Sequence, residues 1–94
     1  LPTMTPDKKK RLIDAYNAYL ERSPTADKPY EDIVDTDGSP MTPRKSLQKG
    51  IANGAIFRNV ENYLQKHPEM TFGQFVDALG RMQPRPSRAR HWKI

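Results

Sequence analysis

The sequence predicts an all-α fold: a compact bundle of four or five short helices with a basic, Pro-containing C-terminal tail. Apolar residues recur at spacings of three and four in several stretches, which places them on one face of a helix. Two Thr-Pro pairs and one Thr-x-x-Gln pattern indicate where helices begin. No stretch shows the sustained polar–apolar alternation of a half-buried strand, so we expect no β-sheet.

The first helix is expected to begin at Pro6, with Thr5 as its N-cap and Asp7 in its first turn. Ser23-Pro24 should end this helix, because the residue before a proline avoids helical dihedral angles. The apolar stripe between these limits consists of Leu12, Ile13, Tyr16, Tyr19 and Leu20.

A shorter helix is predicted over residues 28–34, with Asp27 as its cap. The residues expected to face inward from this helix are Tyr30, Ile33 and Val34. Residues 35–40 consist almost entirely of turn-forming residue types, so we expect a linker there.

Thr42-Pro43 repeats the start signal of the first helix, and the helical pattern then continues from residue 44 to residue 67. The apolar face changes direction near Asn53-Gly54, so two helices and one bent helix both fit the pattern. Glycine in a helix interior costs roughly 1 kcal/mol relative to alanine. The four-residue spacing of Gly50 and Gly54 would allow another helix to approach closely.

The last helix carries the most complete set of local signals. Thr71 and Gln74 form a capping box, and Met70 and Phe75 form the matching hydrophobic staple. Gly80 lies where a left-handed residue would close the helix. Its buried stripe should consist of Phe72, Phe75, Val76 and Leu79.

The 94 residues are enough for one domain, which we place at residues 1–82, followed by the basic tail at residues 83–94. Because only 35% of the residues are hydrophobic, the core must be small. The predicted core is Leu12, Ile13, Tyr16, Leu20, Ile33, Val34, Leu47, Ile51, Ile56, Phe57, Val60, Leu64, Phe72, Phe75, Val76 and Leu79.

Composition also bears on location. Every apolar run is far shorter than the roughly 18 residues of a membrane span, and no apolar region typical of a secretory signal follows the start. We therefore expect no membrane partner. The chain contains no cysteine, which is typical of the cytoplasm or another reducing, non-secretory compartment.

The formal charge of +5 is concentrated at one end of the chain. Residues 81–94 contain five bases and no acid, together with His91 and Trp92, whereas residues 1–80 hold 11 bases and 11 acids. A second basic cluster, at residues 8–11, opposes the dipole at the start of the first helix, which suggests that it serves a partner.

No pattern for catalysis or for a cofactor is present, and we expect a protein that is not an enzyme. His67 and His91 lack the neighbouring ligands of a metal site or a catalytic triad. A calcium loop with Gly38 at its sixth position would need ligands where Ile33 and Arg44 stand. No glycine-rich phosphate-binding motif occurs, so no small-molecule substrate is inferred.

Two functions fit this chain. The first is a non-enzymatic nucleic-acid-associated binding protein that uses the basic tail on a helical scaffold, because clustered cations neutralise phosphates and an aromatic ring stacks on bases. Its candidate contact residues are Arg81, Arg85, Arg88, Arg90, His91, Trp92, Lys93, Lys8, Lys9, Lys10 and Arg11. The alternative is a helical protein–protein interaction module, adaptor or regulatory, with a solvating or docking tail; the neutral body favours it.

The element order from Val60 to Trp92 is also compatible with a helix-turn-helix. Its third element would be residues 87–94, with Ser87 as the cap. Pro84 and Pro86 crowd the entrance to that element, which argues against this arrangement.

Overall fold

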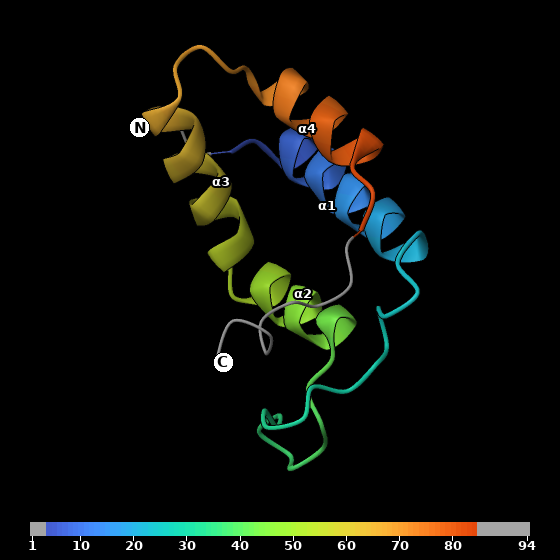
Figure 1. Cartoon of the computed structure of the whole chain (residues 1–94). Coiled ribbons are helices and arrows are strands. Elements are labelled where there is room, and N and C mark those ends of the chain that lie inside the picture. The colour runs from blue at the N-terminus through green and yellow to red at the C-terminus, as the bar shows by residue number, and fades with distance from the viewer. Residues whose placement is uncertain (1–3, 85–94) are drawn as a thin grey trace, which may run out of the picture.

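The computed structural model describes residues 4–84, and this part of the chain is all-helical (Figure 1). It contains α1 (Pro6–Glu21), α2 (Pro43–Ala52), α3 (Ala55–Lys66) and α4 (Phe72–Arg81). No strand forms within residues 4–84; the only β-type pairing there is an isolated antiparallel bridge between Val34 and Pro40. The predicted helical fold class is therefore confirmed for the described residues.

The helices lie as two pairs. α1 and α4 lie side by side and run in the same direction, and α2 and α3 form the second pair (Figure 1). Contacts at both ends of the first pair confirm its parallel direction. Arg11 near the start of α1 lies over the ring of Phe72 at the start of α4, and Arg22 after α1 reaches the carbonyl oxygen of Leu79 near the end of α4.

Threonine side chains cap the N-termini of three of the four helices, as the sequence predicts. The hydroxyl oxygens of Thr5 and Thr42 accept bonds from the backbone N–H groups three residues later, at 3.2 and 3.1 Å. At α4 the capping box is complete: the Gln74 N–H donates to the Thr71 hydroxyl at 3.1 Å, and the Thr71 N–H donates to the Gln74 side chain at 2.9 Å. These bonds satisfy N–H groups that a helix leaves unpaired.

Two glycines determine how α2 and α3 meet: one ends α2, and the other allows the two helices to approach closely. Gly54 has a φ of +82°, in the left-handed region that glycine adopts without strain, and the chain therefore forms two helices here. A Cβ atom at Gly50 would lie 2.7 Å from Cγ1 of Ile56, so only glycine lets the first turn of α3 approach α2 this closely.

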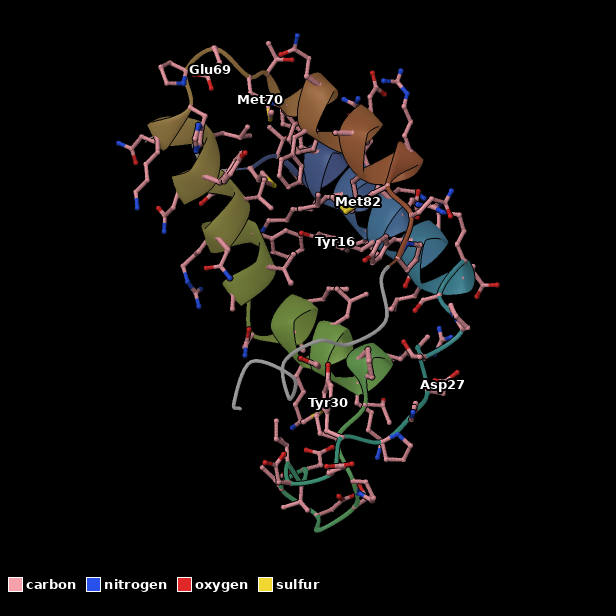
Figure 2. All side chains as sticks on the ribbon, viewed as in Figure 1. Tyr16, Asp27, Tyr30, Glu69, Met70 and Met82 are labelled. Atoms are coloured by element: carbon pink, nitrogen blue, oxygen red, sulfur yellow. The ribbon has the colours of Figure 1, made fainter. Side chains whose placement is uncertain are left out.

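The core consists of two clusters. The larger has Leu12 at its centre, 0% exposed, and the smaller lies between α2 and the end of α1. The buried residues of the larger cluster are Met4, Leu12, Phe57, Val60 and Leu79. Those of the smaller cluster are Leu20, Ala26 and Leu47. Tyr16 points from α1 toward the α2–α3 pair and packs against both clusters (Figure 2). Burial raises the pKa of its hydroxyl.

The predicted helix at residues 28–34 is wrong. The chain folds back on itself as a hairpin, in which the Met41 N–H donates to the Ile33 carbonyl at 2.9 Å and the Asp35 N–H donates to the Ser39 carbonyl at 2.7 Å. The reversal uses Gly38, whose φ is +87°. A helix of seven residues forms too few bonds to offset its nucleation, whereas this turn pairs the backbone locally.

Three residues of this region therefore have roles other than those predicted. Ile33 and Val34 are not in the core: they are 50% and 65% exposed. Asp27 caps no helix; its carboxylate binds the Arg44 guanidinium, with Nε 2.7 Å from Oδ1. The core instead includes Met4 and Ala26, which the helical periodicity did not indicate.

Gly80 is not a left-handed closing residue either. It lies inside α4, and within residues 4–84 the glycines with positive φ are Gly38 and Gly54. The end of α4 is capped from outside the helix: Nη2 of Arg22 donates to the carbonyl oxygens of Leu79 and Met82 at 3.1 and 2.7 Å. A cation at a helix C-terminus also favours the helix dipole, so a glycine turn is not needed.

Candidate functional site

Three of the four bases at residues 8–11 lie over aromatic rings. Lys8 Nζ and Arg11 Cζ are 5.5 and 5.2 Å from the ring centroid of Phe72, and Lys9 Nζ is 5.1 Å from that of Phe57. These are cation–π distances, which orient the charged groups without neutralising them. Lys10 differs, because its ammonium pairs with the Asp14 carboxylate at 3.2 Å.

Helix geometry explains this division. Lys8 and Arg11 are three residues apart, so both lie on the side of α1 that faces α4. Lys9 is turned toward α3, where Phe57 lies in the first turn. Lys10 points away and meets Asp14 four residues later, an ordinary surface pair.

The same end of the molecule holds two helix N-termini. Because α1 and α4 are parallel, the positive ends of both helix dipoles lie close to Lys8 and Arg11. The acid in the first turn of α1 is Asp7. Within residues 4–84 no carboxylate pairs with Lys8, Lys9 or Arg11. We call these three residues, with the first turns of α1 and α4, the basic end.

An aromatic cluster joins the end of α3 to the start of α4. The Tyr63 ring, from α3, lies 4.3 Å from the His67 ring and 5.7 Å from the Phe75 ring, centroid to centroid. Tyr63 is 42% exposed. Sequence reasoning missed this cluster as a candidate contact, although Tyr63 and His67 are four residues apart and therefore neighbours on a helix.

The structure separates Arg81 from the basic end. Arg81 is the last residue of α4, and a ten-residue helix places its two ends about 14 Å apart. Arg81 and the residues at 8–11 are therefore not one contiguous patch. The remaining candidates lie outside the described residues, as does the third element of the helix-turn-helix arrangement: Arg85, Arg88, Arg90, His91, Trp92 and Lys93.

A second surface is formed by residues 30–41, which we call the hairpin. Two lysines of α2 hold it: Lys49 Nζ lies 2.8 Å from Oδ1 of Asp35, and Lys45 Nζ donates to the Ser39 hydroxyl at 2.8 Å. The Asp35 side chain is only 15% exposed. The hairpin thus has a defined position on α2, and its exposed apolar residues are Ile33 and Val34.

Carboxylates in and beside the hairpin are held in their charged form. The hydrogen bond from Lys49, and then the backbone N–H of Thr36, lower the pKa of Asp35. The Ser39 hydroxyl and N–H lower the pKa of Asp37, and the hydrogen bond from Arg44 lowers the pKa of Asp27.

We expect Lys49→Met to raise the pKa of Asp35 toward the usual range of an aspartate, because its largest stabilising contact is removed. A carboxylate whose pKa is lower in the folded state than in the unfolded state stabilises the fold. This stabilisation is fully present above the unfolded-state pKa, and it is lost as the pH falls through the folded-state pKa. Carboxyl carbon NMR titration measures the change. Lys66→Met, remote from the hairpin on α3, is the control, and an unchanged Asp35 pKa in Lys49→Met would contradict the assigned contact.

The described residues offer little for other kinds of site. Among residues 4–84 no group of three or more His, Cys, Asp or Glu side chains is placed to hold a metal ion. None of the helices there is both long enough and apolar enough to span a membrane. Comparison with known proteins found no protein-family model, no curated protein and no solved structure that matches the chain.

Proposed function

We propose that this protein is a non-enzymatic nucleic-acid-associated binding protein that contacts phosphates through the basic end and through the bases of its C-terminal residues. The observation that carries the proposal is that Lys8, Lys9 and Arg11 gather beside two helix N-termini with no carboxylate partner among residues 4–84. Cations arranged in this way attract phosphates, and the release of condensed counterions drives their binding.

The neighbouring groups would add to this contact. Backbone N–H groups in the first turn of a helix bind phosphate oxygens, and each of the two first turns at the basic end keeps N–H groups that the Thr5 and Thr71 hydroxyls do not bind. Tyr63 is 42% exposed, and we infer that the exposed part of its ring offers a surface on which a base can stack. Arg81 stands at the far end of α4, about 14 Å away, which corresponds to about four nucleotide steps along one DNA strand.

Salt dependence tests the proposal. Each phosphate contact on duplex DNA contributes about −0.9 to the slope of log affinity against log salt concentration. The three bases of the basic end should contribute about −2.7, and the four Arg and Lys residues beyond Pro84 about −3.6. The full chain is titrated at several salt concentrations against duplex DNA, single-stranded DNA and RNA.

Variants of each region measure how much of this salt-dependence slope that region contributes. Lys8→Gln/Lys9→Gln/Arg11→Gln should remove close to half of it, and ending the chain after Pro84 should remove most of the rest. Lys10→Gln is the matched control, because its ammonium is already paired with Asp14, and the slope should barely change. Circular dichroism verifies that each variant keeps its helices. Absence of binding at low salt, or an equal loss with Lys10→Gln, would overturn the proposal.

A helical protein–protein interaction module is the second candidate function. The exposure of Ile33 and Val34 favours it, because these two large apolar side chains are left uncovered within residues 4–84. Full-length protein that binds none of the three nucleic acids at low salt would select this alternative.

A further inference from the structure

The hairpin carries two consecutive β-branched side chains that the described residues leave uncovered. Ile33 is 50% exposed and Val34 is 65% exposed. Successive residues of an extended chain point to opposite faces, so neither face of this segment is buried. The salt bridge from Lys49 and the pairing with residues 39–41 hold the segment extended nevertheless. Both faces of this ordered segment are therefore accessible to a binding partner.

The backbone of Val34 is available as well. In its bridge with Pro40 the hydrogen bonds are made by the neighbouring residues, so the N–H and carbonyl of Val34 point away from the hairpin partner. No hydrogen bond to either group is formed within residues 4–84. An outward-pointing N–H and carbonyl on an exposed residue can form backbone hydrogen bonds with one residue of an added extended segment.

Charge indicates which segment fits. Asp27 and Asp35 are already paired with Arg44 and Lys49, but Asp32, directly beside Ile33, is exposed and forms no salt bridge within residues 4–84. Pairing with the hairpin of a second copy would bring the two Asp32 carboxylates close together, which is unfavourable. A basic segment with apolar side chains is complementary. Residues 85–94 have that composition, with four Arg and Lys residues, no acid, and the apolar Trp92 and Ile94.

The described chain ends near the start of the connection that leads to the hairpin. The Arg22 guanidinium binds the Met82 carbonyl at 2.7 Å, so α4 ends beside the end of α1, where the connection to the hairpin starts. Ten extended residues span up to about 33 Å. We propose that the hairpin, through Ile33, Val34 and the free edge of Val34, is the docking surface for residues 85–94 of the same chain. The proposal does not depend on nucleic-acid binding.

Trp92 is the single tryptophan of the protein, so selectively excited fluorescence of the full chain reports on it directly. Quenching by acrylamide is compared for the full chain, for Ile33→Ser/Val34→Ser, and for a synthetic peptide of residues 84–94. We expect the ring in the full chain to be quenched several-fold less efficiently than in the peptide, and to emit at shorter wavelength. The double variant should be quenched like the peptide. Ala18→Ser, an exposed position on α1, is the control and should behave like the unchanged protein.

Circular dichroism confirms that the double variant keeps its helices, as expected for substitutions at exposed positions. A Trp92 ring that is as accessible in the full chain as in the peptide would overturn the proposal. So would protection that persists in the double variant, since the ring would then be covered by another surface. Protection that grows with protein concentration would assign the docked segment to a second copy and refute docking within one chain.

Discussion

Leu12→Ala should lower the free energy of unfolding by about 2–5 kcal/mol. Leu12 is 0% exposed and lies in the larger core cluster with residues of α3 and α4, so truncation leaves a cavity that touches three helices. The cost combines the reduced apolar burial with the weaker van der Waals attraction among the side chains that line the cavity. Urea unfolding followed by far-UV circular dichroism measures it.

Ile13→Ala is the matched control for Leu12→Ala, because it removes the same number of carbon atoms from the next position of α1. Ile13 is only partly buried, so water already contacts part of its side chain and the cost should be smaller. Equal costs for the two variants would mean that the face of α1 has been assigned wrongly.

Phe57→Ala should cost about 3–5 kcal/mol. The ring is 8% exposed, belongs to the same cluster as Leu12, and carries the Lys9 ammonium over its face. Its removal therefore opens a larger cavity and also releases one cation of the basic end. Because a domain of this size has a total stability of only about 5–14 kcal/mol, much of the population should unfold in moderate urea.

Phe75→Ala provides the comparison for Phe57→Ala. The sequence predicts both rings as core, but Phe75 is only partly buried and contacts the exposed Tyr63. Its replacement should cost less than that of Phe57 and should leave Lys9 in place. Urea midpoints of the two variants, measured side by side, test this order, and a larger loss for Phe75→Ala would contradict the packing described for α3 and α4.

The candidate site was only partly predictable. The basic run at residues 8–11 is visible in the sequence, and the pairing of Lys10 with Asp14 follows from helical spacing. The placement of Lys8 and Arg11 over Phe72 does not follow from helical spacing. Both bases are about sixty positions from Phe72 in the sequence, and they meet it only when α1 and α4 pack in parallel. The exposed edge at Val34 was missed for a related reason: its apolar neighbours suggested burial, whereas pairing with residues 39–41 placed it outside the core.

The sequence by itself determined the helical class, the three threonine caps and most of the apolar stripes. These features depend on interactions between residues three or four positions apart. Such interactions form in a helix however the rest of the chain packs. Tertiary structure alone decided the burial of Met4, whose N–H donates to Glu61 Oε2 at 2.8 Å, and the end of α4, which Arg22 caps across 57 positions. Such contacts require the helices to be packed first, and the free energy of that packing is carried by the whole core rather than by any local pattern.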